Sequence, residues 1–507
     1  MRKNSIAVAS ASFLLLAGAA ITAAPAAQAG TPGGTHAADR NTDFNGDGYE
    51  DVLTGAPGAT VGGHRGAGYV TVQYGSAKGI TTTGRAVIGQ NTPGVPGAAE
   101  AGDGFGKALA SGDLDSDGYD DAIVGIPGED IGTVADAGGI VILWGSPKGL
   151  SGGAGQWLEA DRPTAGKRFG AGLAAARFTA DTPGDLLAVL DRTDLRLHLF
   201  EPAAPGAATS AFRPRAVRTD SGALTGADRS GVAAAGRAIQ PTSLTTGDYD
   251  NNGYADLVVS GVSGGEEPGH GWSAHWAGGA DGLTRVRELR GGPVAASGDL
   301  NSDGYDDLVT GEPHSPDDGG ETFTGGVVGV YYGSEEGPAG VEGPGSPPRY
   351  LTQDSPGVAG AAEEGDGWGT DLSLGDTDGD GYADLAIGAP GEDIGSVADA
   401  GAVWVLRGSP DGLTTVRSRD FNQNSPHVPG AAEKGDRFGG QVRLVDPNRD
   451  GKSGLLAAAP GENTHDGAVW VFSAGSGGVG ATGSWSYGGG SLGAPYADAR
   501  YGAAIDD

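Results

Sequence analysis

The nonapeptide Asp-Leu-Asp-Ser-Asp-Gly-Tyr-Asp-Asp, residues 113–121, recurs along the chain and decides its fold. Other full copies start at residues 43, 248, 299 and 376, and a weakened copy starts at residue 446. In every copy, side chains with an oxygen atom stand at positions 1, 3 and 5, and glycine stands at position 6. Alternate side chains converge within such a tight loop, and glycine permits its sharp turn. The pattern therefore favours a hard cation bound by oxygen atoms.

The resemblance of these copies to an EF-hand loop stops at the ninth residue. An EF-hand loop ends with a bidentate Glu at position 12, whereas each full copy has Asp at position 9, followed by an apolar run such as residues 122–126. We therefore predict Ca²⁺ loops of nine residues, each between two strands. The alternative is a set of solvated acidic turns, since Asp and Gly are ordinary turn residues. Five full copies with the same ligand positions favour calcium, and Mg²⁺ seldom occupies all-protein sites.

We call these segments the nonapeptide loops and number them by the repeat unit that contains them. Their predicted calcium ligands are the residues at positions 1, 3, 5, 7 and 9, where position 7 contributes its backbone carbonyl. The predicted ligands are Asp43, Asn45, Asp47, Tyr49 and Asp51; Asp113, Asp115, Asp117, Tyr119 and Asp121; Asp248, Asp250, Asn252, Tyr254 and Asp256; Asp299, Asn301, Asp303, Tyr305 and Asp307; Asp376, Asp378, Asp380, Tyr382 and Asp384; and Asp446, Asn448 and Asp450. Because Gly454 replaces the ninth-position Asp in the last loop, we expect about five calcium sites and a weak sixth.

Composition limits the classes of partner. The formal net charge is −33, which argues against DNA, RNA or an anionic membrane as a partner. Glycine accounts for 99 of the 507 residues without a Gly-X-Y period, so a collagen helix is excluded. The chain has no cysteine and therefore no disulfide, and bound calcium would supply a different crosslink.

Residues 1–29 have the pattern of a secretory signal peptide. Arg2 and Lys3 precede an apolar core at residues 7–21, and small residues at 27 and 29 form a cleavage site, which predicts an extracellular protein. A membrane anchor is the alternative, but the apolar core is short for a membrane span, and no later stretch is long and apolar enough. Residues 30–41 are polar and are expected to be a flexible lead-in.

The spacing of the loops predicts seven repeat units. The second and fourth loops start at residues 113 and 248, 135 residues apart, about twice the usual spacing of roughly 70. A decayed third unit fits between them, with an aromatic-Gly pair at Phe169 and a strand-like run at 186–190. Each unit offers four short strands and no helical periodicity. We therefore predict an all-β fold, a seven-bladed β-propeller over residues 42–507.

The two ends of this array complement each other. The first unit begins at its nonapeptide loop and has no aromatic-Gly strand before it, whereas residues 500–506 contain such a strand at Tyr501-Gly502. We expect the C-terminal strand to join the first blade and close the ring, which would remove exposed sheet edges. A frayed tail is the alternative.

The aromatic-Gly strands and the Gly-Ala-Pro elements at residues 55–57 and 388–390 resemble FG-GAP repeats. Such repeats build the seven-bladed head of integrin α-chains and many secreted bacterial proteins. The resemblance extends over essentially all of residues 41–507, although the third unit has no ligand residues and the fourth and fifth lack a clear Phe-Gly pair. It implies adhesion or ligand binding on a propeller surface.

The sequence gives only weak evidence for an enzyme. Two Gly-x-Ser-x-Gly matches, at 261–265 and 489–493, do not open a helix as a nucleophile elbow requires, and His270 and His275 are expected to lie on the surface. We therefore predict a non-catalytic, monomeric adhesion or recognition protein with an unknown protein or glycan ligand, no nucleic acid partner and no membrane span. Trp272, Trp276 and Trp485 are candidates for its binding face. The alternative is a secreted hydrolase or lyase built on propeller loops.

Overall fold

The computed structural model describes residues 42–180, 184–191, 195–200, 214–218, 239–263, 269–314 and 323–506. The side chains of residues 154, 195–200 and 214–218 are not described. The predicted signal peptide, 1–29, and the lead-in, 30–41, lie outside the described residues. Within the described ranges, no helix has the length and hydropathy needed to span a membrane.

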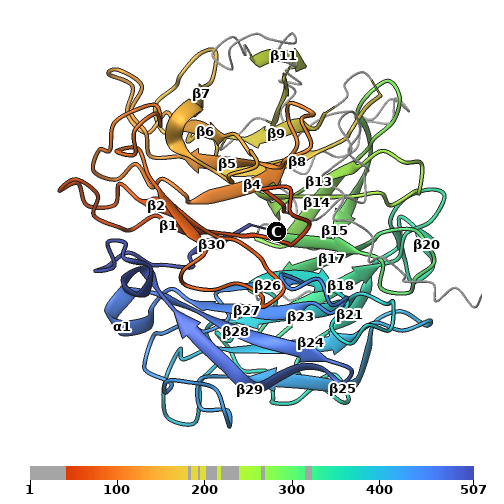
Figure 1. The fold of residues 1–507 in the computed structure, drawn as a ribbon. Helices are drawn as coiled ribbons and strands as arrows, with labels where there is room; N and C mark the ends of the chain where they lie inside the picture. The colour runs from red at the N-terminus through yellow and green to blue at the C-terminus, as the bar shows by residue number, and fades with distance from the viewer. Residues whose placement is uncertain are drawn as a thin grey trace, which may run out of the picture.

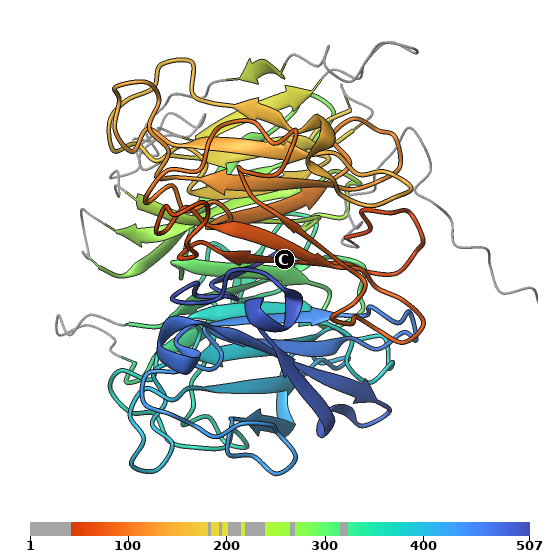
Figure 2. The ribbon, with the colours of Figure 1, turned by 60° about the vertical axis from the view of Figure 1, so that its left-hand side comes forward.

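The fold is an all-β propeller made of four-stranded antiparallel sheets around a common centre (Figures 1 and 2). The blades of the first, second and fourth units consist of β30 (Ala504–Ile505), β1 (Val52–Ala56), β2 (Tyr69–Gln73) and β3 (Arg85–Ile88); β4 (Ala108–Gly112), β5 (Asp121–Ile126), β6 (Gly139–Leu143) and β7 (Gln156–Leu158); and β12 (Ile239–Gly247), β13 (Asp256–Ser263), β14 (Gly271–Ala277) and β15 (Thr284–Arg290).

The remaining complete blades belong to the fifth, sixth and seventh units. They consist of β16 (Val294–Gly298), β17 (Asp307–Glu312), β18 (Val327–Tyr331) and β21 (Arg349–Leu351); β22 (Asp371–Gly375), β23 (Asp384–Ala389), β24 (Ala402–Arg407) and β25 (Thr414–Phe421); and β26 (Gln441–Val445), β27 (Gly454–Ala459), β28 (Ala468–Gly475) and β29 (Gly478–Tyr487). Minor elements are the ribbon β19 (Ala339–Gly340) and β20 (Gly343–Pro344), the short helix α1 (Glu462–His465), and 3₁₀ turns at Gly152–Ala154 and Gly489–Leu492.

The prediction of a seven-bladed propeller is wrong: six blades are complete in strands and side chains among the described residues. The third unit contributes the inner strands β8 (Gly172–Ala176) and β9 (Leu186–Leu190). Its outer strands are β10 (Leu195–Phe200) and β11 (Pro214–Arg218), and the side chains of these two strands are not described. Its sequence differs in a way that accounts for this. The unit has no loop acids at ligand spacing, and residues 201–238 are rich in Ala and Gly with few large apolar residues.

The core lies between neighbouring blades. Strands such as β5 and β6 are buried along their whole length, which explains their continuous apolar runs. The aromatic residue of each aromatic-Gly pair is fully buried at these contacts, namely Phe105, Phe169, Trp368, Phe438 and Tyr501. The glycine that follows is required by close packing: Gly106 has a φ of 84°, and a Cβ there would lie 2.7 Å from Val70.

The C-terminal strand closes the ring, as predicted. β30 pairs antiparallel with β1, with Thr54 opposite Ile505, and Figure 1 shows the chain end beside β30. Tyr501 is buried, and its hydroxyl lies 2.6 Å from Thr71 Oγ1. The innermost strands then follow one another around the centre in the order β30, β4, β8, β12, β16, β22 and β26. The second, fourth, fifth, sixth and seventh nonapeptide loops each join an innermost strand to the second strand of a blade, and the first loop directly precedes β1, the second strand of its blade. All six loops therefore lie at one end of the propeller.

Candidate calcium-binding loops

The nonapeptide loops share one backbone arrangement, organised by the carboxylate at position 1. In the second loop, Asp113 Oδ1 accepts the Asp117 N–H at 3.0 Å and Asp113 Oδ2 accepts the Gly118 N–H at 3.1 Å. The equivalent pair of bonds recurs at Asp43, Asp248, Asp299, Asp376 and Asp446. The weakened seventh loop therefore keeps the same turn, although its ninth residue is Gly454.

The aspartate at position 9 ties each full loop to the blade. Asp121 is 1% exposed, and its Oδ1 accepts the Gly145 N–H at 2.9 Å. Its Oδ2 accepts the Leu114 N–H at 3.1 Å. The bond to a downstream glycine recurs at Asp51, Asp256, Asp307 and Asp384. The predicted ninth-position ligands thus also have a structural role, which the sequence pattern did not reveal.

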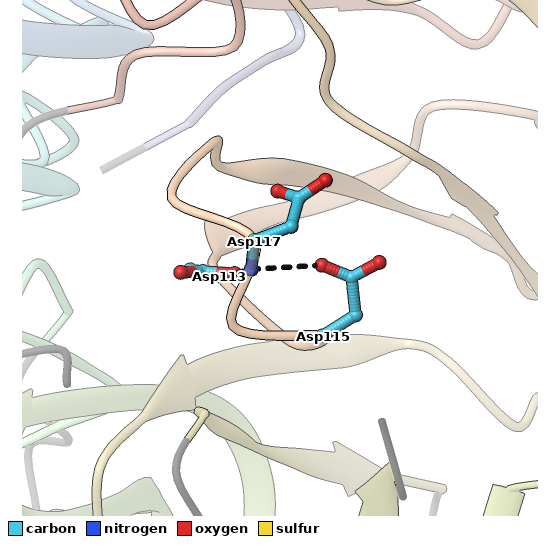
Figure 3. A group of neighbouring side chains, drawn as sticks. All are labelled: Asp113, Asp115 and Asp117. Atoms are coloured by element: carbon cyan, nitrogen blue, oxygen red, sulfur yellow. Dashed lines mark hydrogen bonds between the residues drawn. The ribbon is translucent and has the colours of Figure 1, made fainter. Parts of the chain in front are cut away.

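The side chains at positions 1, 3 and 5 project from the same loop, as Figure 3 shows for Asp113, Asp115 and Asp117. One carboxylate oxygen from each of these three lies within 4.8 Å of the other two, and the same is true of Asp376, Asp378 and Asp384. In the other loops an Asn replaces one of the acids and keeps an oxygen donor, at Asn45, Asn252, Asn301 and Asn448. Such all-oxygen sets fit calcium, which takes carboxylate, amide and backbone oxygens.

Burial without a counter-charge makes these carboxyl groups hard to ionise. Burial raises the pKa of Asp115 to about 7, with added repulsion from Asp117 and Asp113. Burial also raises the pKa of Asp51 to about 8 and that of Asp307 to about 7. A bound divalent cation would favour the charged carboxylates and reverse this cost.

The sixth loop differs from the others because a guanidinium group lies against its acids. Arg407 Nη1 is 2.8 Å from Asp378 Oδ2 and 2.8 Å from Asp384 Oδ2. It also donates to Thr377 Oγ1 at 2.9 Å, and Arg407 is 8% exposed. The residue in the same place beside the second loop is Trp144, since both residues directly precede the glycine that binds the ninth-position Asp. A calcium ion in the sixth loop would therefore share its carboxylate ligands with the guanidinium group of Arg407.

The prediction that His270 and His275 lie on the surface is wrong. His275 is 1% exposed, and its Nε2 lies 3.2 Å from Asp256 Oδ2, a predicted ligand of the fourth loop. His270 is 3% exposed and lies 3.3 Å from Glu312. His275 belongs to β14, and His270 directly precedes it. Strand pairing places both side chains in the interior, and a segment rich in Gly and Trp does not indicate this burial.

Neighbouring loops touch through the residue at position 8. Asp120 Oδ2 of the second loop accepts the Asp43 N–H of the first loop at 2.7 Å, and Asp306 contacts Asp248 in the same way at 2.7 Å. Asp185 of the third unit accepts the Asp113 N–H at 3.2 Å, so this unit retains the contact although it has lost the ligands.

A cavity of about 300 Å³ lies where the innermost strands meet at the loop end of the propeller. Hydroxyl groups of Thr42, Ser111 and Ser297 line it, together with charged side chains from the first, second, third and seventh units: Glu50, Asp120, Asp185 and Arg443.

The tryptophans proposed for a binding face do not form one exposed surface. Trp276 is 8% exposed and is covered by Arg285, whose guanidinium carbon lies 5.7 Å from the ring centre. Arg290 lies at 5.4 Å from the ring of Trp272. Trp485 is partly buried and packs on Tyr487 with ring centres 5.2 Å apart. These tryptophans therefore contribute mainly to packing within their own blades.

Comparison with known proteins agrees with this architecture. The FG-GAP repeat matches residues 40–72, 105–143, 291–330 and 368–406. Phosphatidylinositol-glycan-specific phospholipase D of Mus musculus is 30% identical over 191 residues, 37% of this chain and 21% of the relative. Integrin alpha-5 of Xenopus laevis is 37% identical over 123 residues, 24% of this chain and 10% of the relative. Integrin alpha-6 of Homo sapiens is 32% identical over 129 residues, 25% and 10% of the two chains.

The chain thus spans about a fifth or less of the length of these curated relatives. The matched segments coincide with the first, second, fifth and sixth units, each with its nonapeptide loop. The chain contains FG-GAP repeats and forms an integrin-like β-propeller.

Proposed function

We propose that this protein is a secreted, calcium-binding recognition module that binds a protein or glycan as a monomer and catalyses no reaction. The observation that carries the proposal is the repetition of one loop geometry, with all-oxygen donors, at the same end of the propeller in six units. Calcium in these loops would crosslink the first two strands of each blade and keep the surface that recognises the ligand rigid.

The similarity to integrin α-chains supports an adhesion role, whereas the similarity to a phospholipase D supports an enzyme. The cavity where the innermost strands meet, with its carboxylates and Arg443, is the site that a hydrolase or lyase would use. The two hypotheses differ in whether a bound ligand is converted, and a single screen separates them.

The test is a screen of the purified secreted protein on glycan and peptide arrays, with millimolar calcium and with EDTA. We expect saturable binding that depends on calcium and leaves the ligand unchanged. A variant with Asp113→Asn and Asp376→Asn serves to link binding to the loops, and Glu364→Gln, an exposed acid outside them, serves as its control. Product formed from a glycan, peptide or glycolipid would overturn the non-catalytic proposal.

Secretion is tested separately, by N-terminal sequencing of protein recovered from the medium of expressing cells. We expect cleavage after Ala29, so that the mature chain starts at Gly30. Protein retained in cells with an intact N-terminus would contradict the extracellular assignment.

A further inference from the structure

A second repeated set of polar residues lies at the end of the propeller opposite the nonapeptide loops. Each set combines a Gln after the outermost strand of one blade, an Asp before the aromatic-Gly pair of the next blade, and a Glu after that blade's second strand. We call these sets the Gln–Asp–Glu triads. They occur in the second, sixth and seventh units as Gln90, Asp103 and Glu129; Gln353, Asp366 and Glu392; and Gln423, Asp436 and Glu462.

The three triads have the same geometry. The Gln side chain donates its Nε2–H to the Glu carboxylate at 2.8 Å, 2.8 Å and 2.6 Å in the second, sixth and seventh units. The backbone fixes the Glu beside the Asp, since Gly128 N–H donates to the Asp103 carbonyl at 3.0 Å. The same bond joins Gly391 to Asp366 at 2.9 Å and Gly461 to Asp436 at 3.0 Å.

This backbone contact requires glycine. A Cβ on Gly128 would lie 2.1 Å from the Gly102 carbonyl oxygen, and on Gly461 it would lie 1.9 Å from that of Gly435. The Pro-Gly-Glu sequence of these units therefore places the Glu next to the loop that contains the Asp, and the glycine permits this close approach of the two backbones.

In each triad, the amide oxygen of the Gln has no hydrogen-bond donor among the described residues. The atoms are Oε1 of Gln90, Gln353 and Gln423, and these residues are 4%, 1% and 2% exposed. A buried acceptor without a donor costs free energy, because it has lost its hydrogen bonds to water and gained none. The same cost recurs at three equivalent positions, which points to a positively charged ligand that all three share.

The charges of the triads agree with such a ligand. Asp103, Asp366 and Asp436 are each 2% exposed, and each accepts one backbone N–H, from Glu100, Glu363 and Glu433 respectively. Burial, with repulsion from the neighbouring acids, raises the pKa of all three triad glutamates to about 7. Each triad therefore places two carboxyl groups beside a buried amide group, where solvent screens the repulsion between the carboxyl groups poorly.

We propose that each Gln–Asp–Glu triad binds a hard divalent cation, with calcium as its probe. Two carboxylates neutralise the charge of the ion, and the Gln amide oxygen supplies a neutral donor, as calcium sites commonly require. The ion would connect the outer strand of one blade to the inner strand of the next, whereas an ion in a nonapeptide loop holds the strands of a single blade. The first unit has Ala59 where the second has Glu129, in the sequence Pro-Gly-Ala, and so provides no such site.

The test compares calcium stoichiometry, by native mass spectrometry and calorimetry, between the natural chain and the triple variant Glu129→Gln, Glu392→Gln and Glu462→Gln. We expect the triple variant to bind about three ions fewer. The matched control changes the exposed neighbours, Glu100→Gln, Glu363→Gln and Glu433→Gln, and should bind as many ions as the natural chain.

A single Glu392→Gln variant, expected to lose one ion, keeps the test valid if the triple variant folds poorly. The inference is independent of the nonapeptide loops: if those loops failed to bind, the natural chain would still bind about three ions, and the triple variant none. Unchanged stoichiometry in the folded variants would overturn the proposal. In that case a changed pH dependence of melting would indicate that each triad holds a shared proton.

Discussion

The second and sixth nonapeptide loops have nearly the same sequence but face different neighbours. Both have Asp at positions 1, 3, 5 and 9, and each brings three carboxylates within 4.8 Å. Trp144 stands beside the second loop, whereas Arg407 in the equivalent place contacts two acids of the sixth. In the proposed function, the second loop would depend on an external cation to neutralise its charge, whereas Arg407 already neutralises part of the charge of the sixth loop. One motif can therefore give sites of different affinity, according to what the adjacent strand supplies.

Removal of calcium by a chelator should have the largest effect on the stability of the protein. Each site held at a calcium concentration 100-fold above its Kd contributes ~2.7 kcal/mol to stability, so EDTA should lower the Tm by an amount on the order of 10 °C. Differential scanning calorimetry in EDTA and in millimolar calcium measures this. Identical melting curves would mean that the nonapeptide loops are acidic turns without bound metal.

Replacement of Arg407 should have opposite effects with and without calcium. In EDTA, Arg407→Leu leaves Asp384 buried without its partner, and we expect a loss of about 3–5 kcal/mol. In calcium, the sixth loop should bind roughly tenfold more tightly, because the ion no longer competes with a guanidinium group.

The matched control variant is Arg419→Leu. Arg419 lies on the neighbouring strand β25 and donates a hydrogen bond to the Val479 carbonyl. It does not touch the sixth loop. Calcium titrations followed by calorimetry compare the two variants. Equal calcium affinity in the natural chain and in Arg407→Leu would remove the proposed distinction between the two loops.

Loss of the position-1 carboxylate should cost more in the second loop than in the sixth. Asp113→Ala removes one calcium ion and two backbone hydrogen bonds, and should lower the free energy of unfolding in calcium by about 3–4 kcal/mol. Asp376→Ala should cost about 1–2 kcal/mol, because Arg407 still neutralises Asp384. Chemical denaturation at fixed calcium measures both values, and the reverse order would contradict the role given to Arg407.

The smallest expected effect is a pH dependence that appears only without calcium. Burial raises the folded-state pKa of Asp51 to about 8 and that of Asp307 to about 7, from the ordinary aspartate value of 3.8. The folded state therefore holds more protons than the unfolded state between about pH 4 and pH 8, and its stability falls as the pH rises through this range. We expect the Tm in EDTA to decrease from pH 5 to pH 8, and the slope to flatten in calcium. A Tm in EDTA that rises over this range would show that the carboxyl groups are stabilised as anions.

The local sequence was sufficient to predict those features that depend on residues close together in the chain. The nonapeptide predicted a turn with converging oxygen atoms, and the bonds from Asp113 to residues 117 and 118 have that form. The spacing of the copies predicted a propeller, and Tyr501-Gly502 predicted the closing strand, because each repeat is a supersecondary unit with its own pattern. The predicted count of seven blades was wrong, because only six units form blades that are complete in strands and side chains among the described residues.

Only the tertiary structure decided what lies opposite each loop. Strand pairing brings Arg407 to Asp384 across 23 positions and Trp144 to the same place beside Asp121, and the sequence spacing is identical in the two cases. The burial of His275 and the meeting of Gln90 with Glu129 likewise depend on how blades pack. A motif determines which atoms one loop can offer, but the charge and exposure around those atoms are set by residues distant in sequence, because electrostatic interactions act through space and only folding fixes those distances.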